Sequence, residues 1–218
     1  MAGARFAERG LYAIADTTFA TGAALERAVS AAIAGGARVI QYRDKSADGR
    51  WRRREAGALR ALCRLHGVPL IVNDDVALAL EIDADGVHLG REDTALEEAR
   101  ECLGDRFVIG VSCYDEIERA ENAQTRGADY VAFGSMFPST TKPEAVPAGI
   151  GVIERARPRV RVPIVAIGGI TPDNGGSLVE AGADMLAVVS GVFAHRDPRE
   201  AASRYARLFE NRAEVEKR

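Results

Sequence analysis

The sequence predicts one α/β domain folded as a single (β/α)8 barrel, the TIM barrel. The chain has 218 residues, which fits one such barrel or one doubly wound domain. Short apolar segments alternate with longer helix-like segments, as in parallel strands joined by crossover helices. A short phrase of small and acidic residues also recurs along the chain. An open doubly wound sheet is the alternative, but it usually has fewer strands at this length.

The apolar segments number eight, which is the strand count of the barrel. The predicted strands are Leu11–Ala15, Val39–Tyr42, Leu70–Val72, Val87–Leu89, Val108–Val111, Tyr130–Phe133, Ile164–Ile167 and Leu186–Val189. No linker divides the chain, so residues 1–218 are expected to form a single domain. The barrel would span about 10–210, and the charged tail 211–218 would fray.

The recurring phrase comes directly before four of these strands. It reads Gly36-Ala37-Arg38, Ala84-Asp85-Gly86, Gly127-Ala128-Asp129 and Gly182-Ala183-Asp184. Glycine just past a helix supplies the left-handed cap of the helix end. The phrase therefore marks a repeated helix-to-strand junction.

The segments between the strands are compatible with helices. Residues 25–34 are rich in alanine, a strong helix former. Thr171-Pro172 is a good helix start, with Thr as cap and Pro in the first turn. In the second helical segment, apolar residues recur at helical spacing and arginines mostly face elsewhere. These apolar residues are Trp51, Ala58, Leu62 and Leu65, and the arginines are Arg52, Arg53 and Arg54.

Composition excludes several classes of partner. Hydrophobic residues make up 47% and charged residues 28%, with a net charge of −3, so no general attraction for nucleic acid or anionic membranes is expected. No apolar run approaches the roughly 20 residues that span a bilayer, and no secretion signal is recognisable. The three cysteines are widely spaced, which favours reduced thiols in the cytoplasm. The sequence leaves a homo-oligomer open.

Polar residues follow the second, third and fourth predicted strands, at the barrel end that carries chemistry in this fold. Gln41 and Arg43 point to one side of an extended segment, and Lys45 could follow them. The alternative for the two cations is ion pairing on a solvated loop. Asn73, Asp74 and Asp93 offer the hard oxygen ligands that suit magnesium. Their alternative role is helix capping, with Asp74 or its neighbour Asp75 before one helix and Asp93 before the next.

The later strand ends offer hydroxyls, glycines and one cation. Ser112 could hydrogen-bond a ligand or cap the following helix, while Cys113 has no coupled base that would make it a nucleophile. The long loop 134–147 carries Ser139, Thr140, Thr141 and Lys142, either an anion clamp or a polar surface loop. Gly168-Gly169 and Ser190-Gly191 follow strands seven and eight, where these barrels recurrently bind phosphate. His88, inside a strand, is expected to be a hydrogen-bonded core residue rather than a catalyst.

Seven motifs in order resemble the thiamine-phosphate synthase family over about residues 11–209. They are QYRDK at 41–45, NDD at 73–75, ADGVHLGRED at 84–93, GVS at 110–112, FGSMFPSTTK at 133–142, AIGGIT at 166–171 and VVSG at 188–191. The resemblance implies an enzyme that joins a pyrimidine diphosphate to a thiazole phosphate, giving thiamine phosphate and pyrophosphate. This sequence departs from the family pattern at Arg91, where many members have Gln, at Ser139, where Thr is frequent, and at Cys113-Tyr114, where Thr-His is common.

The resemblance also implies roles for individual residues. Asp74 and Asp93 would hold Mg2+ on the pyrimidine diphosphate, whose other contacts would be Gln41, Arg43, Lys45, Asn73 and Lys142. Ser112 would lie near the pyrimidine ring and, with Arg43, Lys45 and Lys142, take part in catalysis. The thiazole phosphate would contact Ser139, Thr141, Gly169, Val189 and Ser190.

We expect the C–O bond to break before the new C–N bond is well formed, because the electron-rich ring can share the developing positive charge. The alternatives are a thiazole tautomerase-like enzyme, which would need no magnesium, and a non-catalytic phosphate-binding barrel.

Overall fold

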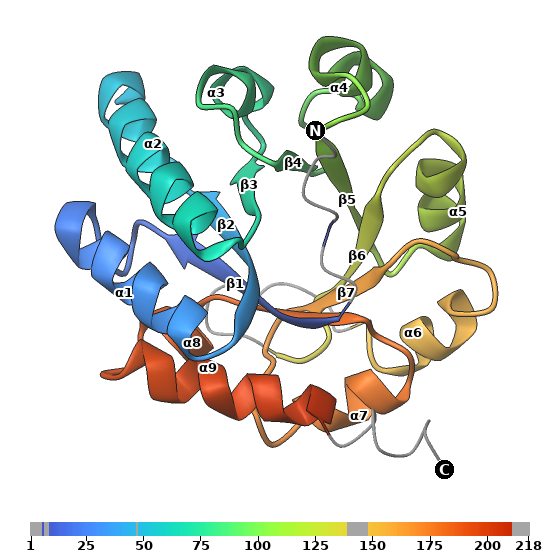
Figure 1. The fold of residues 1–218 in the computed structure, drawn as a ribbon. Coiled ribbons are helices and arrows are strands. Elements are labelled where there is room, and N and C mark those ends of the chain that lie inside the picture. Colours follow the sequence, from blue (N-terminus) through green and yellow to red (C-terminus); the bar gives the residue numbers. More distant parts are fainter. Residues whose placement is uncertain (1–5, 7–8, 47, 139–147, 211–218) are drawn as a thin grey trace.

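The computed structural model describes residue 6 and residues 9–46, 48–138 and 148–210. Within these ranges the strands close into one barrel in the order β1-β2-β3-β4-β5-β6-β7-β8, with every neighbouring pair parallel. Helices surround the ring of strands, from α1 and α2 in blue and cyan to α9 in red (Figure 1). The (β/α)8 prediction is confirmed, and the doubly wound alternative is wrong because β1 pairs with β8.

The elements alternate along the chain as a barrel requires. The strands are β1 (Gly10–Asp16), β2 (Ala37–Arg43), β3 (Leu70–Asn73), β4 (Gly86–Leu89), β5 (Val108–Tyr114), β6 (Tyr130–Gly134), β7 (Ile164–Ile167) and β8 (Met185–Val188). The helices are α1 (Gly22–Ala34), α2 (Gly49–His66), α3 (Val76–Glu81), α4 (Leu96–Leu103), α5 (Ile117–Thr125), α6 (Gly151–Ala156), α7 (Gly175–Glu180), α8 (Ser190–Phe193), α9 (Pro198–Ala206) and the 3-10 turn η1 (Arg207–Phe209).

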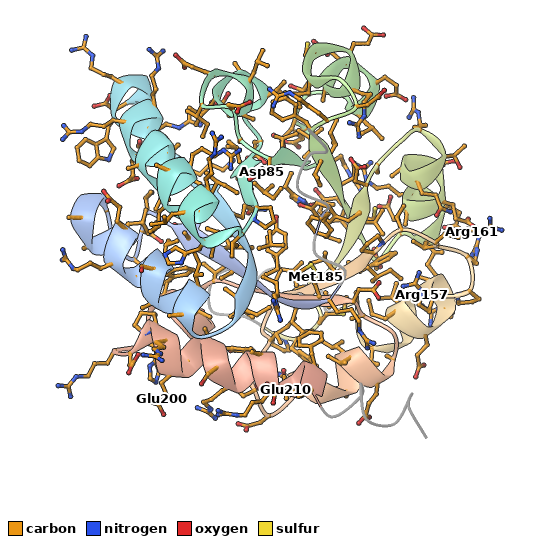
Figure 2. All side chains as sticks on the ribbon, viewed as in Figure 1. Asp85, Arg157, Arg161, Met185, Glu200 and Glu210 are labelled. Carbon is orange, nitrogen blue, oxygen red and sulfur yellow. The ribbon has the colours of Figure 1, made fainter. Side chains whose placement is uncertain are left out.

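Alternation along each strand divides the core into two parts. The interior of the barrel is filled by a small cluster that includes Tyr12, Tyr130 and Met185, and Met185 lies near the centre of the ring in Figure 2. The larger cluster lies between strands and helices and includes Ile40 and Tyr42. These two residues face the helices, so Gln41 between them faces the interior, as the alternation predicts.

The recurring phrase forms the same staple at three junctions. Asp85 Oδ2 accepts hydrogen bonds from Leu70 N (2.8 Å) and Arg60 Nη1 (2.9 Å). Asp129 Oδ2 accepts from Ile109 N and an arginine of α4, and Asp184 Oδ2 accepts from Ile164 N and the arginine that follows α6. Each carboxylate therefore joins the start of one strand, the start of the next, and the preceding helix. At the fourth junction, which leads into β2, the exposed Arg38 stands where the other three junctions have the aspartate.

The helix α2 exists where predicted but buries a different face. Trp51 is 39% exposed and Leu65 is 80% exposed, whereas Glu55, Leu59 and Cys63 are buried with Ala56. Glu55 is tolerated inside because its carboxylate accepts hydrogen bonds from the Gly22 N–H and the Tyr42 hydroxyl. The apolar spacing read from the sequence was therefore wrong about which side of α2 packs on the barrel.

The last two strands lead into short helices. The helix α7 begins at Gly175 rather than at Thr171-Pro172, and Thr171 and Asn174 instead close a turn through each other's backbone N–H groups. Directly after β8 comes α8, an extra four-residue helix of the kind found beside phosphate sites in this fold. None of the helices in the described ranges is both long and apolar enough to cross a membrane.

Candidate active site

Two connected hollows open at the carboxyl ends of the strands. A cleft of about 670 Å³ lies over β2 to β5, and a cavity of about 480 Å³ reaches down into the barrel. The residues that line both are Arg43, Asn73, His88, Ser112, Tyr114 and Asp115. A ligand with two chemically different parts could thus occupy both at once.

The cleft contains the two acidic residues selected from the sequence. Asp74 follows β3 with φ of +64°, a left-handed conformation that few non-glycine residues adopt. Asp75, not Asp74, caps α3 by accepting a hydrogen bond from Leu78 N at 2.8 Å. Asp93 accepts from Gly90 N at 2.6 Å, and the cap position of α4 belongs to Ala95. The capping alternative is therefore wrong for Asp74 and Asp93, and both residues line the cleft.

Asp74 and Asp93 lie within hydrogen-bonding reach of each other. Burial and the hydrogen bond to Asp74 raise the pKa of Asp93. Burial acts to raise the pKa of Asp74 as well, but the ammonium of Lys45 and the hydrogen bond with Asp93 hold that pKa below its ordinary value. Two carboxylates this close avoid being charged together unless a cation joins them.

The donor set of the acid pair fits magnesium. Two carboxylates at the head of an open cleft, with the Asn73 amide donating to Asp74 at 2.7 Å, leave most positions of an octahedral ion for water and substrate oxygens. No cluster of three or more His, Cys, Asp or Glu side chains suited to a metal occurs among the described residues. Magnesium does not need such a cluster, because it typically takes one or two carboxylates and keeps several waters.

The cations of β2 also face the hollows. Arg43 forms an ion pair with Asp16 at the end of β1, and Lys45 forms one with Asp74. Thr18 supplies two further hydrogen bonds to Asp16. Although burial acts to raise the pKa of Asp16, these hydrogen bonds and Arg43 lower it. Asp16 was not selected from the sequence, because it ends an apolar strand without any neighbouring motif.

The deeper cavity contains a polar layer that the sequence did not reveal in full. Gln41 donates to the Tyr12 hydroxyl at 2.8 Å, and that hydroxyl lies 2.9 Å from the Tyr130 hydroxyl. His88 bridges Tyr130 and Ser112, 2.9 Å from each oxygen. The expected hydrogen-bonded role of His88 is confirmed, and Ser112 does not cap α5, whose cap position is Glu116. The sequence did not indicate a polar role for Tyr12 and Tyr130, because aromatic residues in strands usually pack in the core.

The glycine loops after β7 and β8 line the far side of the cavity, together with Val189 and Ser190. Gly168 and Gly169 have φ of +103° and +63°, and a Cβ on Gly169 would lie 2.5 Å from the Pro138 carbonyl oxygen. Only glycine fits such a close approach. Ser139, Thr141 and Lys142 lie outside the described residues.

An aromatic and charged rim closes the cleft over β5. Tyr114 has φ of +56° and sits at a bulge between β5 and β6. The guanidinium of Arg91 lies 4.6 Å from the centre of its ring and pairs with Glu116. Cys113 is buried, and burial raises the pKa of its thiol to about 12, which is unsuited to a nucleophile.

Comparison with known proteins gives the family of this chain. Residues 11–192 match the protein family described as thiamine monophosphate synthase. The chain belongs to the thiamine monophosphate synthase family. The thiamine-phosphate synthase of Thioalkalivibrio sulfidiphilus is 52% identical over 202 residues, which is 93% of this chain and 96% of that protein. That of Nitrosococcus oceani is 50% identical over 201 residues, 92% and 93% of the two chains.

A solved structure of the same family has the same fold. The thiamine phosphate pyrophosphorylase of Pyrococcus furiosus superposes with a TM-score of 0.85 at 36% identity, covering 94% of this chain and 96% of that one. Membership of the thiamine monophosphate synthase family therefore extends across the barrel and includes every strand that contributes to the two hollows.

Proposed function

We propose that this protein condenses an aminopyrimidine diphosphate with a thiazole phosphate to give thiamine phosphate and pyrophosphate, with Mg2+ as cofactor. The observation that carries the proposal is that one cleft brings together the carboxylates of Asp74 and Asp93 and the cations of Arg43 and Lys45, with Lys45 ion-paired to Asp74. A diphosphate needs that combination, because its charge calls for a divalent ion on one side and fixed cations on the other. The activities of its relatives agree with this assignment.

The diphosphate would lie in the cleft and the pyrimidine ring in the deeper cavity. Asp74 and Asp93 would hold Mg2+, with Asn73 beside them, and the bound ion would neutralise charge on the diphosphate oxygens. Arg43 and Lys45, joined by Lys142 of the β6–α6 loop, would meet the same oxygens. Asp16 keeps the Arg43 guanidinium at the mouth of the cavity through their ion pair.

We propose a dissociative displacement. The bond between the methylene carbon and the diphosphate oxygen breaks first, and both electrons leave with the pyrophosphate. The growing negative charge on that group is what Arg43, Lys45 and Lys142 would stabilise. The thiazole nitrogen then forms the new C–N bond with its own lone pair, so no general base is required.

The thiazole phosphate would bind on the far side of the cavity. Gly169, Val189 and Ser190 contribute backbone and hydroxyl groups there, beside the start of α8, and Ser139 and Thr141 would also contact the phosphate. Gln41 and Ser112 would contact the pyrimidine between the two phosphate groups. We place this reaction in the cytoplasm, in agreement with cysteines that are unpaired in the structure.

One assay tests the function. The full chain is mixed with both substrates, with and without magnesium, and pyrophosphate release is followed. We expect release only when both substrates and magnesium are present, and a loss of about 10²–10³ in rate for Lys142→Ala. Isomerisation of a thiazole phosphate alone without magnesium would assign the tautomerase activity instead. Ligand binding without pyrophosphate would leave a non-catalytic barrel.

A further inference from the structure

Five polar side chains from five different strands form a continuous hydrogen-bonded chain through the barrel interior. From β2, β1, β6, β4 and β5 in turn, the chain runs Gln41, Tyr12, Tyr130, His88, Ser112, with contacts of 2.8, 2.9, 2.9 and 2.9 Å. The Tyr130 ring lies against Gly110, where any Cβ would be only 1.9 Å from the ring carbon Cζ. The glycine on β5 thus makes the space that lets Tyr130 reach both partners.

The direction of this chain follows from its first member. The Gln41 amide nitrogen can only donate, so the Tyr12 oxygen accepts and its own hydrogen is available for Tyr130. If the bond between the two tyrosines ran the other way, the Tyr12 oxygen would accept from both Gln41 and Tyr130. The buried Tyr12 hydrogen would then have no acceptor, since Gln41 and Tyr130 are the partners that the structure gives this hydroxyl within the described ranges. A buried donor without an acceptor is unfavourable.

His88 transmits the direction to Ser112. Tyr130 accepts from Tyr12, so its own hydrogen goes to His88 Nδ1, and this nitrogen must carry a lone pair as in a neutral ring. A neutral imidazole has one N–H donor and one acceptor nitrogen. Tyr130 donates to Nδ1, so the hydrogen is on Nε2 and is donated to Ser112 Oγ.

We propose that Tyr12, Tyr130 and His88 are positioning residues that fix Ser112 as a hydrogen-bond donor toward the substrate. Because Ser112 Oγ accepts from His88, the hydroxyl hydrogen of Ser112 is left for a group bound where the cleft and the deeper cavity meet. The matching substrate atom carries a lone pair, such as a pyrimidine nitrogen or a diphosphate oxygen. The proposal rests on the proposed function, which makes Ser112 a substrate contact.

The tautomer of His88 tests the direction without any turnover. The measurement is the nitrogen-15 NMR spectrum of the full-length protein near neutral pH, with the ring signals assigned through His88→Phe. The protein has three histidines, and the other two, His66 and His195, are exposed. We expect hydrogen on Nε2 of His88, and a weaker preference for that tautomer in Tyr130→Phe. Hydrogen on Nδ1 would overturn the proposal.

A double-mutant cycle tests the action through Ser112. We expect kcat/KM for the pyrimidine diphosphate to fall by about 10² in Ser112→Ala and by about tenfold or more in His88→Phe. If His88 acts through Ser112, then adding His88→Phe to Ser112→Ala changes the rate by less than about twofold. An equal loss from His88→Phe in both backgrounds would mean a merely structural role. Ser112→Thr, which keeps the hydroxyl, should recover most of the rate.

Two further variants keep the test decisive. Tyr130→Phe removes a single oxygen and repeats the cycle if His88→Phe does not fold. Tyr42→Phe is the matched control, because its buried hydroxyl bonds Asp44 and Glu55 on the helix side of β2. Its effect should be additive with that of Ser112→Ala. If the unmodified protein releases no pyrophosphate, the proposed function fails, and the His88 tautomer still decides the direction of the chain.

Discussion

Removing one carboxylate staple should destabilise the barrel without affecting the site. Asp184→Ala deletes the acceptor of two hydrogen bonds, from Ile164 N at 2.8 Å and Arg157 Nη1 at 2.7 Å. Ile164 is fully buried, so its N–H loses its partner where water does not reach. Figure 2 shows Arg157 beside α6 at the outside of the ring, and its side chain is 32% exposed.

The magnitude follows from these two environments. A buried N–H left without an acceptor costs about 1–3 kcal/mol. The half-exposed ion pair adds less than about 1 kcal/mol, because water and salt screen it. We therefore expect Asp184→Ala to lower the free energy of unfolding by about 1–4 kcal/mol. At about 2–4 °C per kcal/mol for a domain of this size, Tm falls by roughly 2–16 °C.

Urea unfolding of the variants measures this difference. Asp184→Asn keeps an oxygen for the Ile164 N–H and should lose about 1 kcal/mol. The equivalent changes at Asp85 and Asp129 should match Asp184→Ala, because both carboxylates have the same two kinds of donor. Asp173→Ala is the control: its carboxylate is 90% exposed and 3.9 Å from Arg204, so it should change stability by less than about 0.5 kcal/mol. An Asp184→Ala protein as stable as this control would refute the reasoning.

Three further predictions concern other parts of the molecule. Burial raises the pKa of the Cys63 and Cys113 thiols to about 12, and Cys102 is exposed, so a thiol reagent should modify one of the three cysteines in the folded protein and three after unfolding. The pKa of Asp16 in the folded protein lies below its ordinary 3.8, so the ionised carboxylate stabilises the fold above pH 3.8. This stabilisation is lost as the pH falls through the lower, folded-state pKa. The free energy of unfolding of Asp16→Asn, measured against pH, should therefore fall less steeply in acid than that of the unmodified protein. In Gly169→Ala, the new Cβ would be strained at φ of +63° and too close to a loop carbonyl oxygen. This change should raise KM for the thiazole phosphate about tenfold or more and leave KM for the pyrimidine diphosphate within about twofold. Equal changes in both KM values would contradict this expectation.

Most of the barrel could be predicted from the sequence, because parallel strands buried on both sides read as apolar runs. The same alternation put Gln41 and Arg43 on one side of β2, and both line the deeper cavity. The face of α2 could not be predicted in this way. Its inward side includes Glu55, whose partners Gly22 and Tyr42 come from other elements and leave no local pattern.

The site was predictable where it depends on strand ends and hidden where it depends on contacts across the barrel. Asp74 and Asp93 stand at the ends of adjacent strands, so the fold alone brings them together. Tyr12 and Tyr130 are 118 residues apart, and their hydroxyls meet only because β1 and β6 face each other across the interior. The role of Asp16 depends on the register that pairs it with Arg43.

The recurring phrase has two structural roles, one for its glycine and one for its aspartate. Its glycine was read correctly as a helix end, since Gly127 and Gly182 have φ of +92° and +111°. Its aspartate was not interpreted, because the backbone N–H that it accepts belongs to the previous strand. A carboxylate at that position in three of four repeats was nevertheless a visible signal.

The proposed function requires the Asp74 and Asp93 carboxylates to hold one magnesium ion on the diphosphate. The most direct measurement is pyrophosphate release by Asp93→Ala over a series of magnesium concentrations, beside the unmodified chain. We predict a loss of at least about 10² in rate at the magnesium concentration that saturates the unmodified protein. Near-normal turnover of Asp93→Ala with unchanged magnesium dependence would contradict the account.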